Sequence, residues 1–157
     1  MSVKRILFVC TGNTCRSPMA EIILKSKFKN AGVKGIRVSS AGLSATEGAK
    51  ISKNSAMALK KLGLNAYGFK SRQVTAKILL KSDMVICMTD EHKRYISNFP
   101  GVYSIGELTG LGDVPDPYGG DLNEYIRASH KIEDACNIIF EKLLNDKENY
   151  NESSNRL

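Results

Sequence analysis

The feature that most restricts the fold of this sequence is an alternation of short aliphatic runs with segments of helical periodicity. The aliphatic runs predict strands over residues 4–9, 36–39, 83–88 and 102–105. The other segments predict helices from Pro18 to the stop at Gly32, over residues 54–62, 76–81 and 90–97, and from Leu122 onward. Strands that alternate with helices form parallel sheets covered on both faces. We therefore expect a single-domain, three-layer α/β/α fold with a four-stranded parallel sheet of the Rossmann-like type.

The length of the chain suits one domain. With 157 residues it buries roughly two-thirds of its unfolded surface. Its 42% of apolar residues can form a core without metals or disulfides. We expect the domain to occupy residues 1–146. Residues 147–157 are rich in Asn, Glu and Ser and are predicted to form a frayed C-terminal tail.

The cysteines and the amino-terminal segment bear on location. The basic start and short apolar run of MSVKRILFVC resemble a signal peptide, but the run leads directly into Cys10 and a glycine turn without a cleavage site. No stretch approaches the ~18 apolar residues of a membrane span. The four cysteines are irregularly spaced, with no CxxC pair and no His/Cys cluster. We expect free thiols in a cytoplasmic protein, with no metal and no cofactor.

The net charge of +7 favours an anionic partner. The basic residues are scattered through several segments instead of forming one stripe with stacking aromatics. We therefore expect no nucleic acid and no membrane as a partner.

The turn after the first predicted strand carries a Cys and an Arg separated by five residues, Cys10 to Arg16. Such a loop between strand and helix can point its backbone N–H groups inward and form an anion cradle, to which the helix N-terminus adds positive potential. Gly12 would permit a tight curl. Arg16 would bind a phosphate in a bidentate manner, and the same field would stabilise Cys10 as a nucleophilic thiolate. Ser17 could hydrogen-bond this thiolate and ease its departure.

Taken alone, a Cys-x5-Arg spacing occurs by chance in many proteins, and Cys10 could be a small buried residue at a strand end. Its position favours a functional role, because binding sites of parallel sheets lie beyond the carboxyl ends of the strands.

The stretch VCTGNTCRSPMAE at residues 9–21 is similar to the signature of the low-molecular-weight protein tyrosine phosphatase family. The resemblance continues in VSSAG at 38–42, CMT at 87–89 and DPY at 116–118, and it covers essentially the whole chain. It implies the phosphotyrosine protein phosphatase I fold and a cysteine-dependent hydrolase that passes through a phospho-cysteine at Cys10. The residues that it implies in substrate or phosphate binding are Thr11, Gly12, Asn13, Thr14, Cys15, Ser17 and Tyr118.

The same resemblance makes Asp116 the general acid, which afterwards serves as base for the attacking water. Asp113 and Asp121 are expected to be a loop residue and a helix cap. Tyr118 would form a wall of the pocket, shortened because Gly119 and Gly120 follow it where tyrosine-specific members have a second aromatic.

Thr14 bears on the substrate. Tyrosine-directed members generally carry a bulky aliphatic residue there, whereas bacterial protein-arginine phosphatases of the family resemble this sequence in Thr14 and in an Asp-Pro-aromatic-Gly-Gly stretch. The leading hypothesis is a phosphoarginine substrate, a phosphoramidate, with phosphotyrosine as the alternative. Thr14 could also be a tolerated replacement without a role in specificity.

The resemblance also assigns supporting roles. Asn13 would hold the strained loop and Ser40 would brace it, while Phe69 replaces a histidine that many members use in this brace. Cys15 resembles the second cysteine of the family, which implies a reversible Cys10–Cys15 disulfide; a buried structural thiol is the alternative.

The remaining cysteines and histidines are expected to have no catalytic role. Cys87 and Cys136 are predicted to lie in the core, and His92 and His130 at the surface.

Two other functions fit parts of the sequence. Thioredoxin-coupled arsenate reductases share the fold and loop, but they need further cysteines close together in mid-chain, where this sequence has only Cys87. A non-enzymatic phosphate- or nucleic-acid-binding module is supported only by the charge. Loss of turnover in Cys10→Ser with phosphate binding retained would exclude a pure binding module.

Overall fold

Four parallel strands form one sheet in the order β2-β1-β3-β4 in the computed structural model, which describes residues 3–156. The strands are β1 (Arg5–Cys10), β2 (Arg37–Gly42), β3 (Met84–Cys87) and β4 (Val102–Ser104). The register places Cys10 opposite Gly42 and Val9 opposite Cys87. The sequence analysis predicted each of these strands and their parallel arrangement.

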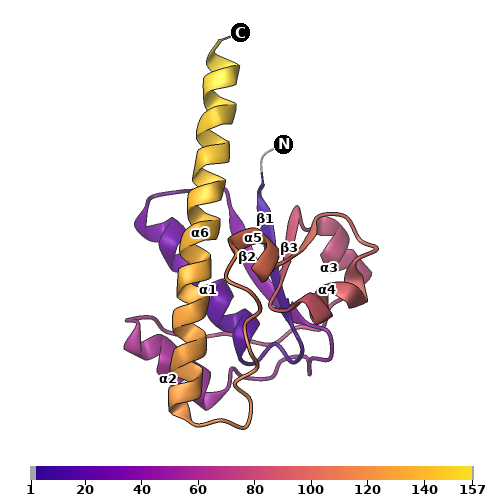
Figure 1. Cartoon of the computed structure of the whole chain (residues 1–157), viewed down its shortest axis with the longest axis vertical. Coiled ribbons are helices and arrows are strands. Elements are labelled where there is room, and N and C mark those ends of the chain that lie inside the picture. Colours follow the sequence, from indigo (N-terminus) through magenta and orange to yellow (C-terminus); the bar gives the residue numbers. More distant parts are fainter. Residues whose placement is uncertain (1–2, 157) are drawn as a thin grey trace.

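Helices cover both faces of the sheet, which confirms the three-layer α/β/α architecture (Figure 1). The helices are α1 (Arg16–Asn30), α2 (Lys53–Lys61), α3 (Ala76–Lys81), α4 (Asp90–Ile96), α5 (Ile105–Thr109) and α6 (Leu122–Asn155). On one face, α1 and α6 pack against each other and against the sheet, together with α2 and α5. On the other face lie α3 and α4. Within residues 3–156, no helix is both long and apolar enough to cross a membrane.

The alternation of side chains along β1 explains why the sheet needs both layers. Ile6 and Phe8 point into the cluster under α1 and α6, whereas Leu7 and Val9 point into the cluster under α3 and α4. All four are almost completely buried, and burying a side chain of this kind contributes roughly 1.5–3 kcal/mol. A strand that is apolar on both faces is stable only between two layers of helices.

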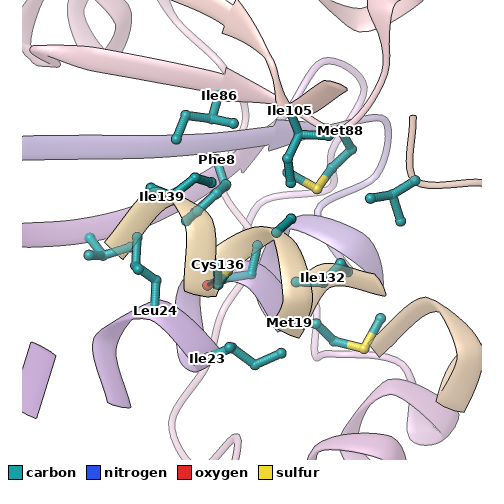
Figure 2. Packing of buried hydrophobic residues seen from close by; sticks show 14 of the residues in the cluster. Phe8, Met19, Ile23, Leu24, Ile86, Met88, Ile105, Ile132, Cys136 and Ile139 are labelled. Atoms are coloured by element: carbon teal, nitrogen blue, oxygen red, sulfur yellow. Dashed lines mark hydrogen bonds between the residues drawn. The ribbon is translucent and has the colours of Figure 1, made fainter. Parts of the chain in front are cut away.

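Helix α6 supplies the outer wall of the larger cluster. Ile132, Cys136 and Ile139 recur at helical spacing and face the sheet and α1. Figure 2 shows these side chains beside Phe8 of β1 and Ile23 of α1. The predicted core position of Cys136 is therefore confirmed.

The short helix α5 was missed by the sequence analysis, which placed Ile105 in a strand. Ser104 ends β4 and caps α5 at the same time: its hydroxyl accepts from the backbone N–H of Glu107, and the Glu107 carboxylate accepts from the backbone N–H of Ser104. This capping box turns the chain into a helix directly after the strand, and Gly110 ends it in the left-handed conformation.

Helix α6 is longer than predicted. Residues beyond 146 were expected to fray, but the helix continues to Asn155, and its last turns stand clear of the rest of the molecule (Figure 1). Extending a formed helix costs far less than starting one, so polar residues can continue it. The domain boundary at residue 146 stays a prediction.

Candidate active site

The loop after β1 lies where the order of strands reverses. The chain runs from β1 to β2 on one side and then crosses to β3 on the other side of β1. This is the point of a parallel sheet at which ligands bind. The loop from Thr11 to Cys15 connects β1 with α1, as the sequence analysis predicted.

The thiol of Cys10 is buried at the floor of this loop, with 2% of the residue exposed. Its sulfur lies 2.9 Å from the Oγ of Ser17. The Nδ2 of Asn13 donates to the same Oγ at 2.8 Å. The bond from Asn13 leaves the hydroxyl proton of Ser17 free to point toward the sulfur. The arrangement therefore allows the sulfur to be the acceptor, as a thiolate requires.

Asn13 holds the loop in its strained shape. Its φ of 55° is in the left-handed region, which is unfavourable for residues other than glycine but best tolerated by Asn and Asp. The side chain uses all of its strong hydrogen-bonding groups, donating to Ser17 and Ser40 and accepting from the backbone N–H of Arg72. The backbone carbonyl of Asn13 accepts from the Ser71 hydroxyl at 2.6 Å. These bonds support the predicted roles of Asn13 and Ser40.

The brace around the loop contains residues that the sequence analysis did not identify. Ser71 and Arg72 bind Asn13, and Glu21 accepts a 3.0 Å hydrogen bond from the Ser40 hydroxyl. With Phe69 in place of a histidine, the brace was expected to be rebuilt or weaker, and the bonds from Ser71 and Arg72 to Asn13 show that it is rebuilt. Glu21 lies in the predicted signature, so its spacing from the loop could have indicated a contact with it.

Gly42 allows the close approach that the sequence analysis attributed to Gly12. A Cβ on Gly42 would lie 2.6 Å from the carbonyl oxygen of Thr11 and 2.9 Å from the N of Asn13. A Cβ on Gly12 would meet only the Oγ1 of Thr14 at 3.7 Å, which is ordinary contact. Among the protein atoms, the close packing that requires a glycine is therefore at Gly42 of β2 and not at Gly12.

Arg16 begins α1 and connects the loop with the predicted acid. Its buried guanidinium donates from Nη1 to the carbonyl of Val114 at 3.1 Å, and Nη2 lies 3.5 Å from the Oδ2 of Asp116. Cys15 precedes α1 without making a side-chain cap, so the first N–H groups of this helix have no capping side chain. A guanidinium and a helix N-terminus thus face one loop, an arrangement that favours an anion.

The acid loop brings Asp116 to this guanidinium. Its carboxyl group is 52% exposed, and Oδ1 accepts from the backbone N–H of Tyr118 at 3.1 Å. Asp113 accepts from the backbone N–H of Asp90, and Asp121 caps α6, so both have the structural roles predicted for them. Tyr118 is 83% exposed, and its role as a pocket wall stays a prediction.

Thr14 and Cys15 form the side of the loop toward α6. The Oγ1 of Thr14, which is half-buried, lies 3.8 Å from the Sγ of Cys15. The Cys15 thiol also lies 3.4 Å from the Oγ of Ser52 and 3.7 Å from the hydroxyl of Tyr125. Burial and this thiol raise the pKa of Tyr125 to about 12. The cysteines at positions 10, 15, 87 and 136 are all free thiols, as predicted.

His92 lies in this site, although the sequence analysis placed it at the surface. Only 6% of the residue is exposed, and its Nε2 lies 2.9 Å from the Oγ1 of Thr11. Burial lowers the pKa of His92, and the positive charge of Arg16 lowers it further. The signal in the sequence was its position just after β3, the strand next to β1. His130 is exposed, as predicted.

A cavity of about 590 Å³ opens beside the loop. Its lining includes Thr11 and Arg16 of the loop region, His92 of α4 and Asp116 of the acid loop. The structure thus brings together the predicted nucleophile loop, anion-binding arginine and acid. In the part of the chain that the structure describes, no three His, Cys, Asp or Glu side chains are grouped as metal ligands would be.

Known proteins are similar to this chain in sequence and in fold. A family model described as low molecular weight phosphotyrosine protein phosphatase matches residues 5–149. A protein-arginine-phosphatase of Bacillus subtilis is 36% identical over 151 residues, covering 90% of this chain and 98% of that protein. The tyrosine phosphatase PtpB of Staphylococcus haemolyticus is 36% identical over 126 residues, covering 77% of this chain and 86% of that protein.

A solved structure of a related protein has the same fold as this chain. It is described as the YwlE arginine phosphatase in a mutant form with a phosphorylated active-site serine, and it superposes with a TM-score of 0.85 at 34% identity, covering 92% of this chain and 98% of that one. The family model spans nearly the whole chain, and the fold agrees throughout. This chain belongs to the low molecular weight phosphotyrosine protein phosphatase family.

Proposed function

We propose that this protein is a phosphatase that removes phosphate from phosphoarginine residues of proteins through a phospho-cysteine at Cys10. The observation that carries the proposal is the convergence of three groups on one loop. The Cys10 sulfur lies 2.9 Å from the Ser17 hydroxyl, the Arg16 guanidinium is buried at the start of α1, and the Asp116 carboxyl group lies 3.5 Å from that guanidinium. Nucleophile, anion-binding group and proton donor are thus assembled at one site.

The first chemical step transfers the phosphoryl group to sulfur. The Cys10 thiolate attacks phosphorus, an S–P bond forms, and the P–N bond to the guanidino group breaks. Asp116 in its acid form gives its proton to the leaving nitrogen. The Arg16 guanidinium and the loop amides stabilise the charge of the phosphoryl oxygens.

The second step releases inorganic phosphate. The Asp116 carboxylate takes a proton from a water molecule, the water oxygen bonds to phosphorus, and the S–P bond breaks. The electron pair returns to Cys10, where the Ser17 hydroxyl donates to the departing thiolate. Asp116 ends the cycle protonated and is ready for the next substrate.

Thr14 supports the choice of phosphoarginine. The residue belongs to the loop, and its hydroxyl makes a long, weak contact of 3.8 Å with the Cys15 sulfur. The hydroxyl is therefore available to a polar guanidino edge or to a water molecule bound to it. The family relatives named as arginine phosphatases add weight to this substrate. PtpB, named as a tyrosine phosphatase, keeps phosphotyrosine as the alternative.

The test compares kcat/KM for phosphoarginine and phosphotyrosine in peptides of the same sequence. We expect the wild-type protein to prefer phosphoarginine, and Thr14→Ile to shift the ratio toward phosphotyrosine because an aliphatic group packs against a phenyl ring. Cys10→Ser serves as the control, with no turnover of either peptide. A wild-type preference for phosphotyrosine would overturn the assignment.

The competing functions are separated by the same variant. A reductase relay needs a partner thiol in mid-chain, and Cys87 is fully buried in the core on the far side of the sheet from α1. A pure binding module would have no turnover to lose in Cys10→Ser. Retained phosphate binding together with lost hydrolysis supports the enzyme.

We also propose a cytoplasmic location, no binding of nucleic acid, and protection of Cys10 by a reversible disulfide with Cys15. The free thiols at all four cysteine positions support a reducing compartment. Mass spectrometry after mild peroxide tests the disulfide: a Cys10–Cys15 bond supports protection, and a sulfonic acid at Cys10 without that bond contradicts it.

A further inference from the structure

His92 is fixed at a defined place beside the catalytic loop. It lies in the first turn of α4, where its backbone N–H donates to the Oγ1 of the capping residue Thr89 at 3.1 Å. Its ring is buried, and its Nε2 bonds the Thr11 hydroxyl at 2.9 Å. Thr11 directly follows the nucleophile Cys10. The contact therefore joins α4 to the first residue of the cradle.

The surroundings of the ring determine which nitrogen carries the proton. The Nδ1 atom is buried and has no hydrogen-bond partner among the described residues. A proton on this atom would be a buried donor without an acceptor, which is more costly than a bare ring nitrogen. The neutral ring with its proton on Nε2 is therefore the favoured form, and Nε2–H donates to Thr11.

The charges around His92 are mixed. Arg16 disfavours a positive ring, whereas Glu91, Asp113 and Asp116 favour it. Burial has the largest effect of all and lowers the pKa of His92. With its pKa lowered from an ordinary value of about 6.5, the ring is mostly neutral at pH 7.5.

The donor direction has a consequence for Thr11. Its Oγ1 accepts from His92, and the hydroxyl proton has no other acceptor among the side-chain contacts of the described residues. Thr11 lines the same cavity as Arg16 and Asp116. The acceptor that the proposed reaction brings into this cavity is the phosphoryl group bound by Arg16.

We propose that His92 is a positioning residue that fixes the Thr11 hydroxyl as a hydrogen-bond donor toward the phosphoryl group held in the Cys10–Arg16 loop. The inference rests on the proposed function, because it takes this loop as the phosphate cradle. The Thr11 hydroxyl would thus be a further donor to the phosphoryl group, besides the backbone amides and the Arg16 guanidinium. In this proposal His92 acts on the phosphoryl group through the Thr11 hydroxyl.

The experiment measures the competitive inhibition constant of inorganic phosphate, with para-nitrophenyl phosphate as the reporter substrate. The variants are Thr11→Val, His92→Leu, their double mutant and His92→Gln, with the exposed His130→Leu as the matched control. Hydrogen bonds to charged groups are strong, so Thr11→Val and His92→Leu should each raise the constant about tenfold. The double mutant should be no worse than either single variant, since both remove the same donor.

His92→Gln separates positioning from packing. Its amide N–H can donate to Thr11 from a similar place, so most of the phosphate affinity should return, and His130→Leu should behave as wild type. The proposal would be overturned if the two increases in the inhibition constant multiplied in the double mutant. It would also be overturned if Thr11→Val left the constant unchanged. If His92→Leu does not fold, Thr11→Val and Thr11→Val/His92→Gln carry the test, because the glutamine change should have no effect once the hydroxyl is absent.

The phosphate inhibition constants test this inference independently of whether the substrate is phosphoarginine. A preference for phosphotyrosine peptides would refute phosphoarginine and leave the phosphate constants unchanged. Phosphate that fails to inhibit the wild-type protein would refute the cradle itself, and with it both proposals.

Discussion

The Ser17 hydroxyl lies 2.9 Å from the Cys10 sulfur, and the side-chain amide of Asn13 donates to the same hydroxyl oxygen. Asn13 donates to Ser17 and to Ser40, and Ser40 in turn donates to Glu21. The donated bonds therefore start at Asn13: one path leads to Ser17 beside the Cys10 sulfur, and the other leads through Ser40 to Glu21.

Replacing Ser17 with Ala should slow catalysis while leaving the loop folded. The variant removes one hydrogen bond to a charged sulfur, a contact worth about 1.5–3 kcal/mol, so kcat should fall about 10- to 100-fold. Rapid-quench measurement should show phospho-enzyme accumulating, because the thiolate is then a poorer leaving group. Unchanged kcat in a folded Ser17→Ala protein would contradict the role assigned to the hydroxyl.

Asp116→Asn should reduce kcat/KM for a phosphorylated peptide by about 10²–10⁴-fold, because general acid catalysis contributes this much. Asparagine keeps the size of the side chain but cannot give up a proton. Asp113→Asn is the matched control in the same loop, since Asp113 accepts from the backbone of α4. Equal losses in the two variants would show that loop structure, and not proton transfer, was affected.

The cysteines should differ sharply in reactivity. Burial raises the pKa of Cys87 and of Cys136 to about 12, so neither forms appreciable thiolate at pH 7.5. Iodoacetamide should label Cys10 in the folded protein and inactivate it, and inorganic phosphate should protect against both. Peptide mass spectrometry should find Cys87 and Cys136 labelled only after unfolding. Their rapid labelling in the native protein would contradict the structure.

His92 should make stability depend on pH in mildly acid solution. Its pKa is lowered in the folded protein, so the unfolded chain binds the proton more readily. The stabilising contribution is complete above the unfolded pKa of about 6.5 and is lost as the pH falls below it toward the lowered value. Urea unfolding at pH 7.5 and 5.5 should show a larger loss for wild type than for His92→Gln.

The exposed His130 supplies the control for this measurement. His130→Gln should keep the wild-type difference between the two pH values, because its ring is in solvent. A wild-type-like loss in His92→Gln would show that another group causes the acid sensitivity.

The sequence predicted correctly those features that are formed by residues close together along the chain. The strand of residues 5–10, the loop after it and the start of α1 are contiguous, so their periodicity and spacing placed Cys10 and Arg16 correctly. Asp116 lies far along the chain and was identified through family resemblance. Its contact with Arg16 depends on how the acid loop packs, which spacing does not reveal.

The features that were missed depend on contacts between distant segments. Ser71 and Arg72 reach Asn13 across more than fifty residues, and Gly42 is restricted by the loop beside it. His92 looked like a polar residue on a helix surface, because nothing near it in the sequence shows that its ring is buried against Thr11. Such roles arise from tertiary packing and not from local pattern.

The backbone hydrogen bonds of Val114 bear on which step limits the rate of turnover. Its N–H donates to the carbonyl of Met88 at the end of β3, and its own carbonyl accepts from Arg16. The segment that carries the acid is thus pinned to the sheet and to the cradle before any substrate arrives. The entropy cost of ordering this segment is therefore incurred during folding and not each time that a substrate binds. We therefore expect bond breaking, and not loop closure, to limit turnover, so that kcat changes little when the viscosity of the solvent is raised.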